Sequence, residues 1–184
     1  MYGLVNKAIE QMVCGEFSHE AWAAIKQRAG LADDVFVSMR PYPDELTYAL
    51  VDAAHQLLGL EHSAILRAFG RYWVLYTAAE GYGELLNLTG ATLAEFLQNL
   101  PNLHARIALL YPELHPPTFQ CVAAGESTLL LHYFSERDGL EPMVLGLLEG
   151  LAERFATPID ITALASRAQG HDHAIFQIRF KASL

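Results

Sequence analysis

A histidine lies on the apolar side of a predicted helix. Residues three or four positions apart, the spacing of one helix face, form this side: Leu93, Leu97, Leu100, His104, Ile107 and Tyr111. Imidazole is the commonest metal ligand among side chains. A single histidine with no second ligand nearby suits a haem, because the porphyrin supplies the in-plane nitrogens. The competing interpretation is a core histidine with a satisfied ring N–H, and spacing alone favours it.

Pro101 stands three residues before this histidine. Proline removes one backbone hydrogen bond from a helix, so it should bend or restart the helix just before His104. Such a bend would either aim the ring or be merely tolerated, and the sequence leaves both interpretations open.

A second group of chemistry-bearing residues lies in the segment LLLHYFSER. If this segment is a strand, Tyr133, Ser135 and Arg137 share one face, each about 6.7 Å from the next. A phenol, a hydroxyl and a guanidinium in a row can donate hydrogen bonds to two neighbouring carboxylates, with Arg137 binding one of them through two N–H groups. The simpler alternative is a solvated strand face.

A third group is the segment PMVLGLLEG, where Met143 and Leu147 are one helical turn apart. Gly146 and Gly150 lie in the same predicted helix, and each costs up to about 1 kcal/mol relative to alanine. Close approach of a flat ligand or of another helix would justify that cost. The two interpretations are equally consistent with the sequence.

The elements that carry these residues change in character along the chain. The first part is predicted to be helical, with a loop at Pro41 and Pro43 and a helix that is capped by Asp44 and ends at Gly59. Further helices are expected from about Ser63, through Trp73 and Tyr76, and from about Thr92 to Tyr111. A turn with a short helix is expected between them, in EGYGELLNLTG.

The predicted secondary structure changes from helices to a mixture of strands and helix at the prolines of YPELHPPT. Strands are predicted in FQCVAA and STLLLHYFSER, then a helix that opens at Pro142, then strands in PIDITALAS and DHAIFQIRFK. We therefore expect an α+β fold in a single domain, residues 1–184. It would combine a helical N-terminal lobe, about residues 1–60, with a C-terminal lobe, about 61–184, that holds an antiparallel sheet and helices.

Composition narrows the function classes. The chain has 184 residues, 52% of them hydrophobic, and a net charge of −9, which argues against nucleic-acid or anionic-membrane partners. Two widely separated cysteines and the absence of a signal-peptide pattern fit a cytoplasmic location. There is no membrane-spanning apolar run, no G-x-S-x-G elbow and no phosphate-binding lysine loop.

Taken together, these segments resemble the H-NOX family, the haem–nitric oxide/oxygen binding domain also found in soluble guanylate cyclases. The resemblance extends from MYGLVNKAIEQMV to DHAIFQIRF and includes AFGRYWVLYT, EGYGELL, NLHARIALLYPEL, YFSER and MVLGLLEG in the family's order. It looks closest to the bacterial, cyanobacterial type that occurs as a separate domain.

The resemblance implies a haem b buried between the lobes. It implies that His104 is the axial iron ligand, on the family's signalling helix, and that Pro117 presses on the porphyrin and distorts it. It further implies propionate contacts from Tyr133, Ser135 and Arg137, and pocket contacts from Val5, Trp73, Met143 and Leu147. The position of Pro101 within that helix is not required by the family.

The function implied is a gas sensor rather than an enzyme. A five-coordinate ferrous haem would bind NO and CO, and NO would weaken or break the bond between iron and His104, so that haem and lobes rearrange. A separate effector protein, a histidine kinase or a cyclase, would receive the signal. Oxygen-stabilising relatives have a distal tyrosine, whereas Met143 lies near that place here and no tyrosine occurs between Asp138 and Phe155. Trp73 is the remaining candidate donor to a bound gas.

Two rival functions stay open at this point. One is a haem-free protein–protein interaction domain that uses its acidic surface. The other is a haem enzyme such as a peroxidase, which would need a distal base or cation, and Arg71 is the nearest candidate. No structural zinc is expected, because RAQGHDHAIF contains no cysteine.

Overall fold

The computed structural model describes residues 1–31, 35–111 and 113–181. Its helices are α1 Gly3–Glu16, α2 His19–Arg28, α3 Asp44–Leu58, α4 His62–Tyr72, the π-helical turn η1 Trp73–Thr77, α5 Ala78–Thr89, α6 Leu93–Gln98, α7 Leu100–Leu110, α8 Glu141–Arg154 and the 3₁₀ turn η2 Arg167–Gln169. Its strands are β1 Thr118–Ala123, β2 Thr128–Phe134, β3 Ile159–Ala165 and β4 Ala174–Phe180. None of the helices in these ranges has the length and hydropathy needed to cross a bilayer.

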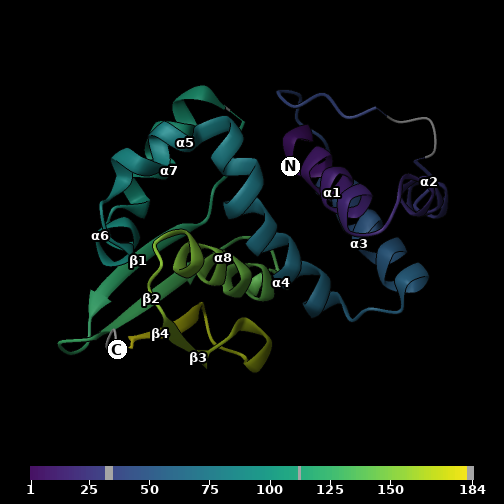
Figure 1. Cartoon of the computed structure of the whole chain (residues 1–184). Coiled ribbons are helices and arrows are strands. Elements are labelled where there is room, and N and C mark those ends of the chain that lie inside the picture. The colour runs from purple at the N-terminus through teal and green to yellow at the C-terminus, as the bar shows by residue number, and fades with distance from the viewer. Residues whose placement is uncertain (32–34, 112, 182–184) are drawn as a thin grey trace.

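The strands form one antiparallel sheet in the order β1-β2-β4-β3. Alternate residues of β2 and β4 are buried, because successive side chains of a strand point to opposite faces. Figure 1 shows α1–α3 on one side of α4, and α5–α7, the sheet and α8 on the other. The α+β class predicted from the sequence is confirmed.

Two hydrophobic clusters hold these parts together. One is built from α1–α4 and includes Trp22, Leu50 and Phe69. The other joins the sheet to η1 and α5–α8. Trp73 is partly buried and packs against both clusters. Helix α4, which follows residue 60, contributes to the first cluster and also contacts α8, so it belongs to neither side alone. The lobe boundary near residue 60 therefore stays a prediction.

The glycines of α8 allow a close helix pair. A Cβ on Gly146 would lie 1.9 Å from the carbonyl oxygen of Arg67, and one on Gly150 would lie 3.0 Å from the Cβ of Val74. On α4, a Cβ on Gly70 would lie 2.1 Å from the carbonyl oxygen of Met143. Of the two interpretations left open by the sequence, the structure therefore supports close approach of another helix.

The prediction of a single helix from Thr92 to Tyr111 is wrong, because the helix is interrupted at Asn99, between α6 and α7. Thr92 caps α6 by accepting a hydrogen bond from the Glu95 N–H at 3.2 Å. Pro101 then lies in the first turn of α7, where its missing N–H has no helical partner to lose. The restart expected just before His104 is thus what the structure has, and it explains Pro101.

Three other expectations need correction. The turn expected in EGYGELLNLTG is instead part of α5, which is non-helical only at Tyr82 (φ −137°, ψ 21°). The helix expected to run through Trp73 changes to π-helical geometry at that residue. Asp44 lies inside α3 rather than capping it, since Pro43 is the N-cap residue and makes no side-chain cap bond.

Candidate functional site

One large cavity lies among α1, α3, α4, α7, α8 and the sheet, with a volume of about 640 Å³. This volume is in the range typical of small-molecule and cofactor pockets. All the site residues predicted from the sequence line it: Val5, Trp73, His104, Pro117, Tyr133, Ser135, Arg137, Met143 and Leu147. The fold therefore brings together residues from six separate segments of the chain.

His104 is held on α7, where its side chain is partly buried. Its Nδ1 lies 3.3 Å from the carbonyl oxygen of Pro117, so Nδ1 carries the proton and donates it to that oxygen. Burial lowers the pKa of the imidazole, and the Pro117 contact offsets this only in part. A neutral ring with Nδ1 as donor leaves the Nε2 lone pair as the metal-binding position.

Aromatic rings support the histidine from the sheet side. The ring centroids of His104 and Phe119 are 5.5 Å apart, and those of Phe119 and Tyr133 are 5.3 Å apart. Tyr133 is only 4% exposed, and burial raises the pKa of its phenol. The ring of His104 thus has a fixed, largely apolar surrounding.

The polar residues of YFSER do not continue a strand, which corrects the expected geometry. β2 ends at Phe134, and the Oγ of Ser135 accepts a hydrogen bond from the Arg137 N–H at 3.0 Å, a turn typical of serine. Tyr133, Ser135 and Arg137 nevertheless line the same cavity. They offer a phenol, a hydroxyl and a guanidinium at its edge.

Arg137 is engaged with the N-terminal part of the chain. Its Nε donates to Oδ2 of Asp44 at 2.6 Å, and its Nη1 donates to the carbonyl oxygen of His115 at 2.9 Å. The ammonium group of Met1 also donates to Asp44 and to the carbonyl oxygen of Tyr42. Burial by itself raises the pKa of Asp44, but the bonds from Arg137 and the N-terminus outweigh it, so the pKa is lowered.

The part that Asp44 has in the site is not predicted by the sequence. Its place in the sequence predicts only a helix cap, whereas the side chain joins α3 to Arg137 across 93 positions of sequence. An acidic residue directly after a proline in a helix start gives no signal of such a distant partner. The phenol pair of Tyr82 and Tyr111, whose hydroxyls are hydrogen-bonded, was missed for the same reason.

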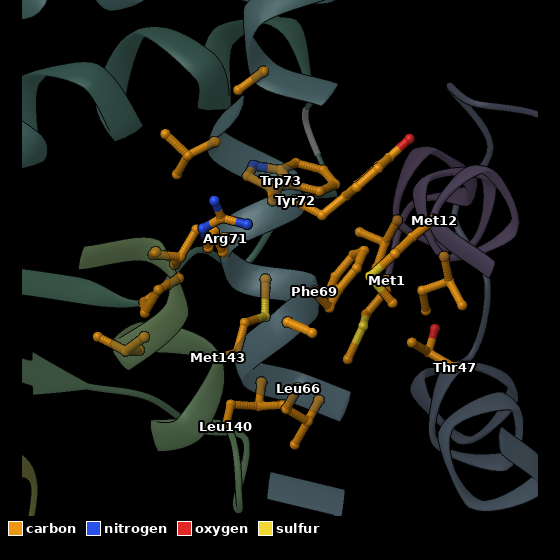
Figure 2. A pocket seen from close by; sticks show the side chains of 18 of the residues that line it. Met1, Met12, Thr47, Leu66, Phe69, Arg71, Tyr72, Trp73, Leu140 and Met143 are labelled. Carbon is orange, nitrogen blue, oxygen red and sulfur yellow. The ribbon is translucent and has the colours of Figure 1, made fainter. Parts of the chain in front are cut away.

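The opposite wall of the cavity is largely apolar. Figure 2 shows Phe69, Trp73 and Met143 among the side chains gathered between α8 and α1. The ring centroids of Phe69 and Trp73 are 5.9 Å apart, and the rings meet edge to face at an angle of 65°. Arg71 also borders the cavity, but its guanidinium is bound to Glu153 of α8, with Nη2 and Oε2 2.6 Å apart.

These donors fit a haem. One neutral imidazole offers a single axial nitrogen, and the apolar walls suit a porphyrin. Tyr133, Ser135 and Arg137 can donate hydrogen bonds to the carboxylates of the porphyrin. Among the described residues no group of three or more His, Cys, Asp or Glu side chains is arranged to hold a bare metal ion. The imidazole and the apolar walls of the cavity are thus compatible with an iron whose in-plane ligands come from the cofactor.

Comparison with known proteins gives consistent results. The family model described as Haem-NO-binding matches residues 2–163. Soluble guanylate cyclase gcy-32 of Caenorhabditis elegans is 31% identical over 165 residues, which is 88% of this chain and 24% of that protein. Guanylate cyclase soluble subunit beta-2 of Rattus norvegicus is 34% identical over 125 residues, 65% of this chain and 18% of that one. The chain thus spans about a quarter or less of the length of these relatives.

Solved structures share the fold. An H-NOX protein from S. oneidensis in the Fe(II) state superposes with a TM-score of 0.92 at 22% identity, covering 100% of this chain and 98% of that one. An H-NOX protein from S. oneidensis in the Fe(II)NO state gives a TM-score of 0.91 at 22% identity, covering 98% and 99%. At this identity the likeness establishes the fold alone.

Proposed function

Because the chain belongs to the Haem-NO-binding (H-NOX) family, we propose that it is a haem-based sensor of NO and CO with His104 as the axial ligand. The observation that carries the proposal is the state of His104: a neutral ring at the cavity wall, with Nδ1 bound to Pro117 and Nε2 left to bind iron. The bound haem would supply a ferrous iron that takes up NO or CO and whose bond to His104 is weakened by NO.

The other residues have separate parts in this proposal. Tyr133, Ser135 and Arg137 would bind the haem propionates, and Pro117 would press on the porphyrin. Val5, Trp73, Met143 and Leu147 would line the pocket. A haem b fits the chain, because Cys14 and Cys121 are free thiols outside any C-x-x-C-H attachment motif.

The apolar wall of the cavity supports selectivity against oxygen. Bound O₂ gains from a hydrogen-bond donor, and no residue of α8 is a tyrosine. Arg71, the candidate for a peroxidase-like site, has its guanidinium bound to Glu153. These features favour gas binding without oxygen chemistry.

The route of the signal starts at α7. Directly after this helix, the ring of Tyr111 packs edge-on against Tyr2 at 4.8 Å, and the Tyr2 hydroxyl accepts a hydrogen bond from the Glu113 N–H at 3.1 Å. A shift of α7 would therefore reach the N-terminal segment. We propose that a separate effector in the cytoplasm of a bacterium, a histidine kinase or a cyclase, receives this change.

Absorption spectra test the proposal. The purified, reduced protein should show a Soret band that shifts on addition of NO and of CO and stays unchanged in air. A stable spectrum of an oxygen complex would contradict the selectivity. A colourless protein that binds no added haem would support the haem-free interaction domain instead.

A further inference from the structure

The π-helical turn η1 interrupts what the sequence predicts as one helix. In this turn the Ala78 N–H donates to the carbonyl oxygen of Trp73, five residues back instead of the usual four. Turns of this kind hold one surplus residue and are frequent at functional sites. Here the turn begins at Trp73, a residue that lines the cavity.

The chain before η1 is closely packed on α8. Gly70 and Gly146 bring α4 and α8 into backbone contact, and a Cβ on either would lie within about 2 Å of a carbonyl oxygen of the other helix. Arg67 of α4 is also bound to Glu149 of α8. The turn η1, which follows directly on this contact, is the first point after it at which the helical hydrogen-bond register changes.

The chain after η1 leads to the histidine-bearing helix. α5 leaves helical geometry once, at Tyr82, and the hydroxyl of Tyr82 is hydrogen-bonded to that of Tyr111 at the end of α7. A surplus residue that left η1 could be taken up at Tyr82, because the helix is already interrupted there. That movement would change the contact with Tyr111.

Thr77 gives a physical reason for such a movement. Its side chain is 7% exposed, and its Oγ1 has no hydrogen-bond partner among the described residues. A threonine in an α-helix can donate to the carbonyl oxygen four residues back, as Thr89 does to Leu85 at 2.7 Å. For Thr77 the carbonyl oxygen four residues back is that of Trp73. An α-helical turn would place the Thr77 hydroxyl within hydrogen-bonding distance of this oxygen, whereas in the π-helical turn Oγ1 is unpaired. An unpaired buried hydroxyl is unfavourable, so the π-helical state lacks a bond that the α-helical state would have.

We propose that η1 is a register switch that positions Trp73 and links the cavity to α7 independently of the bond to His104. A gas in the cavity that displaces the indole shifts the surplus residue from η1 toward Tyr82, pairs Thr77 with the Trp73 carbonyl oxygen, and alters the Tyr82–Tyr111 contact. The inference rests on the proposed function only in taking the ligand to be a gas bound at haem. Thr77 is a positioning residue in this scheme, since it acts through Trp73.

Hydrogen exchange of the haem-loaded, reduced protein tests the switch, with CO as the probe. The absorption spectrum identifies samples in which CO binds and His104 stays on the iron, so a change at α7 is not due to its release. We expect CO to change the exchange of amides in residues 73–82 and at the end of α7 by roughly threefold or more, as a local opening equilibrium would. Deletion of Tyr76, half exposed in η1, should preserve the Soret band and CO binding and abolish both changes.

If the deletion variant does not fold, a matched pair of substitutions tests the register switch instead. Thr77→Val removes an unpaired hydroxyl, so it should raise the Tm and reduce the CO-induced change. Thr89→Val removes a paired one, so it should lower the Tm and leave the CO-induced change intact. A haem-loaded protein that binds CO without a change at residues 73–82, or an effect of CO that survives in the deletion variant, would overturn the switch alone. Absence of any Soret band would instead contradict the proposed function on which the ligand depends.

Discussion

The imidazole of His104 is oriented by a backbone oxygen rather than by a carboxylate. Its Nδ1 faces Pro117, a residue at the turn between α7 and β1, so the ring orientation depends on where this turn lies. Burial lowers the pKa of the ring, which keeps it neutral near pH 7. A neutral imidazole is the form that binds iron, so the surroundings prepare the ring for ligation before any cofactor arrives.

His104→Gly should abolish haem retention because the axial nitrogen is removed, and added imidazole should restore it. The Soret band after gel filtration, with and without imidazole, measures this. Phe119→Leu is a suitable control, since it changes the neighbouring ring and keeps the ligand. Unchanged haem retention and an unchanged iron spectrum in His104→Gly would rule out the ligand assignment.

Asp44→Asn should lower the free energy of unfolding at pH 7 by about 1–3 kcal/mol, because charge-assisted bonds to Arg137 and the N-terminus are lost. The folded pKa of Asp44 is lowered, so its contribution is present above the unfolded pKa of about 3.9 and disappears as pH falls through the folded pKa. Urea unfolding at pH 7, 5 and 3 should therefore show a difference from wild type that shrinks at pH 3.

Asp160→Asn provides the comparison, because Asp160 pairs with Lys181 at the surface, with both side chains more than half exposed. Its loss should cost less than about 1 kcal/mol at any of these pH values. A deficit in Asp44→Asn that persisted undiminished at pH 3 would show that packing, and not the charge, is what the side chain contributes.

Helices α4 and α8 are in backbone contact with each other, and both border the cavity. Met143 and Leu147 project from α8 at positions next to Gly146, so the site residues and the packing glycines alternate along one helix. Any loosening of the pair would displace the cavity wall as well as the core. Packing and site formation therefore depend on the same few residues.

Gly146→Ala should destabilise the protein by about 1–3 kcal/mol or more, since its Cβ would lie 1.9 Å from the carbonyl oxygen of Arg67 and the backbones would have to separate. Chemical denaturation measures the change. Gly15→Ala is the control: it lies in α1 with open space around the added carbon, and it should stabilise by about 0.5–1 kcal/mol. Equal effects of the two substitutions would argue against close helix packing at Gly146.

The molecule as a whole consists of two hydrophobic clusters with a cavity between them. Residues of both clusters line this cavity. Trp73 packs against both clusters, and the bond between Arg137 and Asp44 joins the sheet side to α3. A cofactor seated in the cavity would fill space between the clusters and contact both. Its binding energy would therefore add to the stability of the native state.

Removal of haem should lower the Tm. A ligand present at 1,000 times its Kd stabilises a protein by about 4 kcal/mol, which corresponds to roughly 8–16 °C for a chain of this size. Calorimetry of haem-loaded and haem-free protein measures the difference. Addition of haem to His104→Gly should raise its Tm much less, and an equally large increase in that variant would show that stabilisation does not depend on the axial ligand.

Much of the fold and the candidate site could be predicted from the sequence because their causes are local. Apolar spacing located the helices and strands, and it placed His104 on the buried side of its helix. Residue chemistry then selected Tyr133, Ser135 and Arg137 as a group, and all of them line the cavity. Periodicity and side-chain chemistry are properties of a few consecutive residues, so a sequence displays them directly.

Only the tertiary structure decided how distant segments meet. Asp44 and Arg137 are 93 positions apart, and nothing in either segment specifies the other. The role of Gly146 follows from the approach of α4, and the surplus residue of η1 becomes visible only when the hydrogen-bond register is known. These features arise from packing between elements, which depends on the three-dimensional arrangement of the whole chain and leaves no periodic trace in the sequence.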